Sequence, residues 1–275
     1  MVTEVVVPQE WWRYPPWVES VAGRVTQLKV GRILIYRRVT ASTNDDVRLL
    51  AREGAPDGLV VVADEQTHGR GRLGRPWIAP AEACLLLSVL FRRPFPMERV
   101  GQLSMIMGLA ALDAIQGVTG LRAGLKWPND IILADRKVGG ILSEVESQGK
   151  LMRWAIVGLG LNANADFSPY PELAETAVSL AAVLGREVDR SELLASLLRS
   201  LSARYARLVE GSSPVEEWQA RLGTLGRRVS VRTARDTVTG EAEFVSDEGS
   251  LFVRLDDGSR CEVFAGDVQL SEATE

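Results

Sequence analysis

The segment GRGRLGRPW, residues 69–77, combines three glycines with three arginines directly after an apolar run that is expected to be a buried strand. Glycine lets the backbone approach an anion closely, and arginine offers a planar, permanently charged fork for phosphate or carboxylate. The segment lacks the Gly-Lys-Ser/Thr of a P-loop and does not open a helix as a dinucleotide-binding loop does. It predicts a loop that binds an acidic small molecule or a nucleotide phosphate, with a solvated basic loop as the alternative.

A second segment, KWPNDIIL, places Lys126 beside apolar residues and follows it with Asn129 and Asp130. Such an ammonium group can neutralise negative charge that develops at a reacting carbon or phosphorus. Asn129 and Asp130 suit a metal–phosphate unit. Pro128 has no amide hydrogen to donate, so the segment is expected at an edge or a bend. Taken alone, a surface lysine next to a structural turn explains this segment better.

Three further segments carry weaker signals. Glycines interrupt two strand-like runs, KVGGILSE (137–144) and VGLGLNAN (157–164), which indicates close approach of a ligand or another backbone. A bulged core strand is the alternative for the second run. Ser42-Thr43-Asn44 stands at an expected helix start, where donors can converge on an anion or a ureido-type ligand. Simple capping of the helix explains that triplet better in isolation.

Elements of both kinds must position these residues. Apolar periodicity predicts strands at 31–39, 59–66, 83–93, 121–133, 137–147 and 153–164, and helices at 42–53, 100–118, 171–184, 191–208 and 215–222. After Gly226 the pattern changes to short alternating strands at 227–233, 240–247, 250–257 and 260–268, with a DDGS hairpin signal at 256–259. We therefore expect a Trp- and Pro-rich extension at 1–28, a main domain at 29–224 and a small β-barrel at 225–275.

Composition excludes several classes of function. The net charge is −4, and the last fifty residues hold six arginines against eleven acidic residues, which argues against nucleic acid binding there. Two cysteines far apart, Cys84 and Cys261, are expected to pack rather than to form a disulfide or a metal site. The longest apolar stretch, 103–118, is too short and too polar for a membrane span. No secretory signal opens the chain, so we expect a cytoplasmic protein without membrane contact.

Taken in order, the strings STN, EQTHGRGRLGRPW, KWPNDI, KVGGILSE and VGLGLNAN resemble the biotin protein ligase family. The resemblance runs from about Gly31 to the C-terminus. It implies an α+β fold: a mixed β-sheet with helices packed on one face, as in class II synthetases and lipoyl ligases, followed by a small SH3-like barrel. Because some members carry an N-terminal DNA-binding domain and this chain shows only the Trp-rich extension, the resemblance is to the monofunctional type, with no DNA as partner.

The resemblance also implies a two-step reaction with ATP and biotin as substrates and Mg²⁺ as the metal. The biotin carboxylate attacks the α-phosphorus of Mg-ATP to give biotinyl-5′-AMP and pyrophosphate. A lysine amine of a biotin carboxyl carrier protein domain, of acetyl-CoA carboxylase or a related carboxylase, then attacks the mixed anhydride and releases AMP. A homodimer is one assembly that the family allows.

Site residues carry over by position in the matching strings. Three cations, Lys126, Arg70 and Arg72, are expected to be catalytic, with Lys126 between the biotin carboxylate and the α-phosphate. The expected biotin-binding residues are Ser42, Thr43, Asn44, Gln66, Arg70, Gly71, Arg72, Lys126, Gly139 and Gly140. The expected ATP or adenylate contacts are Gly69, Arg72, Arg75, Trp77, Asn129, Lys137 and Asn162, with Asp130 as the Mg²⁺ ligand.

Two departures and three alternatives accompany this interpretation. Leu73 stands where many members have a basic residue, and His68, the single histidine, has no assigned role. A lipoate–protein ligase of the same fold is the alternative within the class. A biotin-sensing transcription regulator and a nucleotide-binding module are the alternatives outside it.

Overall fold

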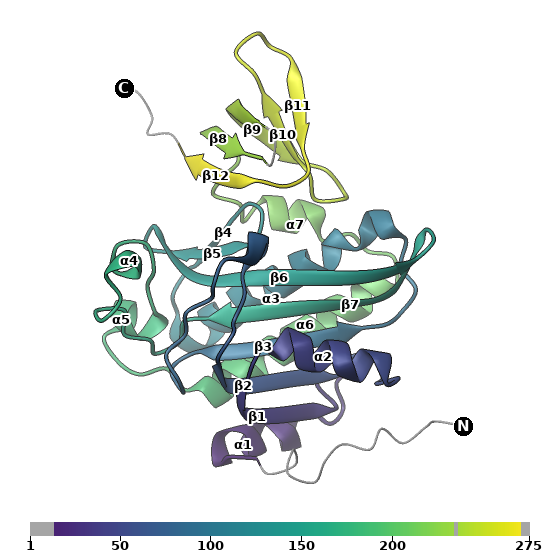
Figure 1. Cartoon of the computed structure of the whole chain (residues 1–275), viewed down its shortest axis with the longest axis vertical. Coiled ribbons are helices and arrows are strands. Elements are labelled where there is room, and N and C mark those ends of the chain that lie inside the picture. The colour runs from purple at the N-terminus through teal and green to yellow at the C-terminus, as the bar shows by residue number, and fades with distance from the viewer. Residues whose placement is uncertain (1–13, 234–235, 271–275) are drawn as a thin grey trace.

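A computed structural model describes residues 14–233 and 236–270. A seven-stranded mixed sheet forms the main body, and a five-stranded antiparallel sheet follows it (Figure 1). The first sheet has the strand order β1-β2-β3-β7-β6-β5-β4, and the second has the order β11-β10-β9-β8-β12. The expected fold class is confirmed by this architecture.

The main sheet contains β1 (Leu34–Thr40), β2 (Val60–Gln66), β3 (Leu85–Phe91), β4 (Gly124–Lys126), β5 (Asp130–Leu133), β6 (Arg136–Gln148) and β7 (Leu151–Leu161). Only β1 and β2 run parallel, and every other neighbouring pair in this sheet is antiparallel. The parallel pair needs a crossover, which helix α2 (Thr43–Arg52) supplies. The carboxyl ends of β1 and β2 therefore lie at the same edge of the sheet.

Helices cover the two faces unequally. The long helices α3 (Gly101–Thr119) and α6 (Arg190–Val209) pack on one face, where Val60, Val62 and other alternate strand residues join the main core (Figure 1). Helix α2 lies on the opposite face, where the strand residues of the other parity form a second core with Val47 and Leu50. One helix thus departs from the expected one-face arrangement, because the β1–β2 crossover has its own apolar stripe to bury.

The part of the extension that the structure describes holds helix α1 (Pro16–Val25), which packs against α6. Trp17 lies over the guanidinium group of Arg190 at 4.4 Å, and Arg24 pairs with both carboxylate oxygens of Glu192 at 2.5 and 2.8 Å. Proline at the first helical position suits a helix start. The other two tryptophans of the extension lie outside the described residues.

Three expected elements are each divided in two. The expected strand 121–133 is the hairpin β4–β5, because Lys126 pairs with Asp130 across a turn that contains Pro128. The expected helix 171–184 is α4 (Pro171–Ala174) and α5 (Leu180–Leu184), because the residues between them pair with Lys137 at the start of β6. The expected strand 260–268 is β11 (Arg260–Val263) and β12 (Asp267–Leu270), which pair with different neighbours.

The second sheet, called here the C-terminal sheet, comprises β8 (Arg228–Arg232), β9 (Thr237–Val245), β10 (Leu251–Arg254), β11 and β12. Helix α7 (Val215–Gln219) leads into it. The hairpin signal at 256–259 is confirmed, since β10 pairs with β11 across it. Both cysteines are free, and burial raises the pKa of Cys84 to about 12. Among residues 14–233 and 236–270, the helices are too short or too polar to cross a membrane.

Candidate active site

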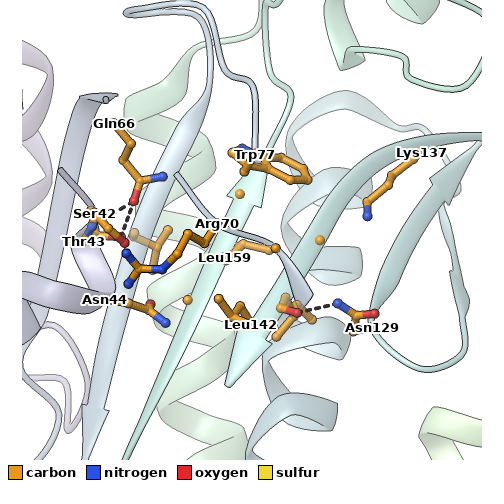
Figure 2. A pocket seen from close by; sticks show the side chains of 16 residues that line it. Ser42, Thr43, Asn44, Gln66, Arg70, Trp77, Asn129, Lys137, Leu142 and Leu159 are labelled. Carbon is orange, nitrogen blue, oxygen red and sulfur yellow. Dashed lines mark hydrogen bonds between the residues drawn. The ribbon is translucent and has the colours of Figure 1, made fainter. Parts of the chain in front are cut away.

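The parallel β1–β2 pair brings the STN triplet and Gln66 together. Ser42 precedes α2, and Gln66 ends β2 at the same edge of the sheet. The Gln66 side-chain oxygen accepts hydrogen bonds from the backbone amide of Thr43 at 2.8 Å and from the Thr43 hydroxyl at 3.0 Å (Figure 2). Ser42 occupies the N-cap position, but its hydroxyl makes no capping bond. That hydroxyl is therefore free to contact a ligand.

A chain of buried polar groups continues from the triplet across the sheet. The Ser88 hydroxyl lies 2.7 Å from the Thr43 hydroxyl and donates to the side-chain oxygen of Asn44 at 2.6 Å. The Asn44 amide nitrogen in turn donates to Glu144 of β6 at 2.9 Å, and Arg48 donates to the same Glu144 oxygen at 2.6 Å. Every member is held by its neighbours, so the network orients the donors and acceptors of the triplet in advance of any ligand.

Three glycines of β6 and β7 flatten the sheet surface beneath this site, which is called the floor here. A Cβ atom at Gly158 would lie 2.4 Å from the side-chain oxygen of Asn44, and one at Gly160 would lie 2.5 Å from the ring of Trp77. Gly140 of the neighbouring strand β6 faces the same side, where a Cβ atom would lie 3.2 Å from that ring. These three glycines let Asn44 and the indole ring lie directly on the backbone of the sheet.

The loop 69–77 folds over the floor as a narrow hairpin. The Gly71 amide donates to the Arg75 carbonyl at 2.7 Å, and the Trp77 amide donates to the Gly69 carbonyl at 2.9 Å. Leu73 stands at the tip with a φ of 57° and is 74% exposed.

The arginines of the loop point in different directions. Arg70 donates two hydrogen bonds to the Asp45 carboxylate of α2, at 2.9 and 2.6 Å, and this contact lowers the pKa of Asp45. Arg72 and Arg75 instead reach the C-terminal sheet, where Arg72 donates to the Gly266 carbonyl at 3.3 Å and Arg75 pairs with Asp267. Burial lowers the pKa of the Arg72 guanidinium group. The loop therefore spans from α2 to β12.

Three cavities meet beneath and beside the loop. The first, about 40 Å³, lies between the STN triplet and Trp77, and Arg70 projects into it (Figure 2). The second, about 420 Å³, has an apolar side formed by Ile78, Phe167 and Leu173. The third, about 520 Å³, lies between the loop, the β4–β5 hairpin and the C-terminal sheet.

Trp77 and Lys137 line all three cavities. The Lys137 ammonium lies 2.6 Å from an Asp130 carboxylate oxygen and 5.5 Å from the centre of a Trp77 ring. Lys126 lines the second and third cavities but not the first. Lys137 thus lies where the three cavities meet, and Lys126, which is expected between the biotin carboxylate and the α-phosphate, lines the two larger cavities beside it.

Several expected contacts have other roles in the structure. Gly139 does not line the first cavity, because side chains alternate along β6. A Cβ atom at Gly139 would point to the opposite face of the sheet, where it would meet the side chains of Ile131 in β5 and Leu161 in β7. Gly69 closes the base of the loop and does not line the described cavities. The Asn129 side chain lines the first and third cavities but donates to the Ile141 carbonyl at 2.6 Å. Asn162 lines the second cavity, yet its amide donates to the Val178 carbonyl at 3.1 Å.

Asp130 is a poor metal site by itself. Its carboxylate is already paired with Lys137, and among residues 14–233 and 236–270 no three acidic, histidine or cysteine side chains gather at metal-binding distance. Magnesium in phosphate-transferring sites needs only one or two carboxylates when the substrate phosphates supply the rest. A magnesium ion at Asp130 would therefore take most of its ligands from the substrate phosphates.

Sequence reasoning missed Ser88, Glu144 and Asp45 as members of the site. Ser88 is fully buried and stands alone among apolar residues in β3, LLLSVLF, which is the one signal that could have marked it. Glu144 ends the quoted string KVGGILSE but was given no role. Asp45 follows the STN triplet directly and was given no role.

Comparison with known proteins agrees with this geometry. Residues 36–162 match the family model described as "Biotin/lipoate A/B protein ligase family", and residues 224–271 match "Biotin protein ligase C terminal domain". The "Biotin--[acetyl-CoA-carboxylase] ligase" of Mycobacterium tuberculosis is 38% identical over 237 residues, which cover 83% of this chain and 85% of that protein. The chain belongs to the biotin protein ligase family.

Other biotin protein ligases extend the comparison. The "Bifunctional ligase/repressor BirA" of Bacillus subtilis is 32% identical over 88% of this chain and 75% of its own length. A solved biotin protein ligase from Aquifex aeolicus, in complex with biotin and ATP, has a TM-score of 0.73 and 30% identity, covering 87% of this chain and 99% of that one. Ahead of the main sheet, the described residues form only α1, not a three-helix DNA-binding unit.

Proposed function

We propose that this chain is an ATP-dependent biotin ligase, which forms biotinyl-5′-AMP and transfers the biotin to a lysine of an acceptor protein. The observation that carries the proposal is the junction at Trp77 and Lys137 of a small polar cavity with two larger ones. An acid bound in the first cavity would present its carboxylate to Lys137, and a nucleotide in the other two would present its α-phosphate to the same ammonium group.

Each cavity suits one part of the substrates. The polar network around Ser42, Thr43 and Asn44 offers donors and acceptors to the ureido ring of biotin. The apolar side of the second cavity, with Phe167 and Leu173, suits adenine. The third cavity is lined by Lys126 and Arg72 and suits the triphosphate of Mg-ATP.

The proposed chemistry is electrostatic. A carboxylate oxygen of biotin forms a bond to the α-phosphorus, and the bond from that phosphorus to the bridging oxygen of pyrophosphate breaks. Two unit negative charges 4 Å apart repel by about 1 kcal/mol in water and several times more in a drier site. Lys137, Arg70 and Arg72 reduce this repulsion and hold the two anions in line.

The loop 69–77 also accounts for the small first cavity. Arg70 occupies that cavity while it pairs with Asp45, so we propose that the loop opens to admit biotin and then closes over the adenylate. Closure excludes water from an easily hydrolysed anhydride. In the second step the acceptor amine forms a bond to the biotinyl carbonyl carbon and gives up a proton to solvent, and AMP leaves with the electrons of the broken acyl–oxygen bond.

The acceptor follows from the names of the relatives. The Mycobacterium tuberculosis protein is named for acetyl-CoA carboxylase, so we propose the biotin carboxyl carrier protein domain of that enzyme, or of a related carboxylase, as the acceptor. Biotin is favoured over lipoate because residues 224–271 match the model described as "Biotin protein ligase C terminal domain".

Pyrophosphate exchange tests the proposal. Purified protein is incubated with ATP, labelled pyrophosphate and either biotin or lipoate, and incorporation of label into ATP is measured. We expect exchange with biotin and background exchange with lipoate. Transfer is then followed on a carrier domain, with its acceptor lysine changed to arginine as the control. Exchange driven by lipoate, or by neither acid, would contradict the proposal.

A further inference from the structure

The side chain of Arg70 fills space in which the acid is proposed to bind. The first cavity measures about 40 Å³, and Arg70 projects into it from the loop 69–77 (Figure 2). A buried water molecule needs about 10–15 Å³, so this volume suits a few waters and is too small for a bicyclic acid. The Arg70 side chain must therefore move before biotin can enter.

Asp45 of α2 holds Arg70 in this position. The two terminal nitrogens of the guanidinium group donate to the two carboxylate oxygens, at 2.9 and 2.6 Å. This parallel arrangement of two hydrogen bonds is the strongest geometry for an arginine–carboxylate pair. The side chains are 37% and 33% exposed, so water screens part of their attraction.

The Asp45 carboxylate is itself anchored to the body of the protein. Arg48, one turn further along α2, donates to Asp45 and also to Glu144 of β6, the latter at 2.6 Å. Glu144 accepts a further hydrogen bond from Asn44 at 2.9 Å. The carboxylate is thus tied to a helix and to the sheet, and it cannot follow Arg70 when the loop moves. Opening of the loop must break the pair between Asp45 and Arg70.

We propose that Asp45 sets the rate at which biotin enters, by holding Arg70 in the first cavity until this pair breaks. The inference rests on the proposed ligase function. It makes Asp45 a positioning residue, which acts through Arg70 and not by contact with a substrate. Breaking the pair also frees the guanidinium charge that the proposed reaction uses.

Asp45→Asn tests the proposal, because it removes the charge and keeps the size of the side chain. Without the pair a larger fraction of molecules has an open loop, and the apparent rate of association with biotin rises in proportion. For a partly exposed pair with two hydrogen bonds we expect a rise of roughly 3- to 5-fold. The dissociation rate should stay at the parental value, because the pair is already broken in the biotin complex.

Both rates can be measured by rapid mixing with biotin at several concentrations. Trp77 lines the first cavity, so the change in tryptophan fluorescence reports binding. A rise in the association rate is a gain, which a general disturbance of the fold would not produce.

Asp46→Asn is the matched control. Asp46 is the next residue of the same helical turn, but its carboxylate pairs with Arg37 of β1 at 3.5 Å, and it lines none of the three cavities. The substitution removes the same charge from the same region and should leave association at the parental rate. An equal rise in Asp46→Asn would show a general attraction of the anionic acid to a less negative surface, and would overturn the role of Asp45.

The remaining outcomes separate the two levels of the argument. Parental association in Asp45→Asn would overturn the role of Asp45 and leave the ligase function standing. Faster dissociation at an unchanged association rate would also overturn it, because Asp45 would then hold the loop over the bound acid. Absence of biotin binding and of biotin-dependent exchange in the parent would instead contradict the proposed function.

Discussion

Gly160→Ala tests whether the Trp77 end of the loop must lie flat on the sheet. The added Cβ atom would stand 2.5 Å from one ring atom of Trp77 and 2.7 Å from two others, well inside van der Waals contact. The ring cannot shift freely toward β6, because it already lies against Gly140. Overpacking of this kind costs about 1–3 kcal/mol. This free energy destabilises only the closed state of the loop, so the population of the closed state relative to the open state should fall roughly 5- to 150-fold.

The assay is the release of biotinyl-adenylate. The intermediate is formed on the enzyme with labelled biotin, and its dissociation is followed after addition of excess unlabelled adenylate. We expect release in Gly160→Ala to be faster by the factor above, with a thermal midpoint close to the parent's because the strain is relieved by opening the loop. Release at the parental rate would refute the idea that the flat floor is needed for closure.

Two variants make this test specific. Gly139→Ala is the control on the neighbouring strand, where a Cβ atom would meet Gly160 and Leu161 on the opposite face at 3.0 and 3.1 Å. It should lower stability without changing release. Trp77→Phe removes the ring atoms that the new methyl group meets. The double variant with Gly160→Ala should therefore release biotinyl-adenylate more slowly than the sum of the two single-variant effects predicts.

Four other substitutions probe the cations, the network and the buried thiol. Lys137→Met should slow adenylate formation by roughly 10²–10³-fold. Lys126→Met should mainly raise the KM for ATP and leave the KM for biotin unchanged. Steady-state kinetics with the reverse pattern would refute the placement of Lys137 where the three cavities meet. Ser88→Ala removes a hydroxyl that contacts Thr43 and Asn44, so denaturant unfolding should show a loss of about 1–3 kcal/mol and the KM for biotin should rise; parental values for both would contradict the role of the network. Burial raises the pKa of Cys84 from 9.0 to about 12 in the folded protein, so the folded state favours the neutral thiol. The resulting contribution to the free energy of unfolding is fully present below pH 9. It is lost as the pH rises toward 12, at up to about 1.4 kcal/mol per pH unit. Cys84→Ala should flatten that part of the stability profile, and an unchanged slope would show that the thiol does not titrate on unfolding.

The sequence was sufficient for five strands of the main sheet and for the convergence of the STN triplet with Gln66. Apolar alternation located β1, β2, β3, β6 and β7, and the STN triplet and Gln66 converge because β1 and β2 are parallel. The main failures were local. A turn inside KWPND converted one expected strand into two.

Other parts of the site depended on long-range pairing that no local pattern encodes. Asp45 receives Arg70 only because the loop folds back over α2. Gly139 and Gly140 are adjacent in sequence, yet the register of β6 places them on opposite faces of the sheet. The contacts from Arg72 and Arg75 to the C-terminal sheet join segments almost two hundred residues apart. Periodicity within a segment carries no information about such partners.

The contact between the loop and β12 has a consequence for the order in which the protein is made. During translation, all five motifs and the whole first cavity leave the ribosome before Asp267 is added. A nascent chain that ends at β11 lacks the residues to which Arg72 and Arg75 attach. Until β12 has been synthesised, the arginines of the loop would be anchored only through the pairing of Arg70 with Asp45.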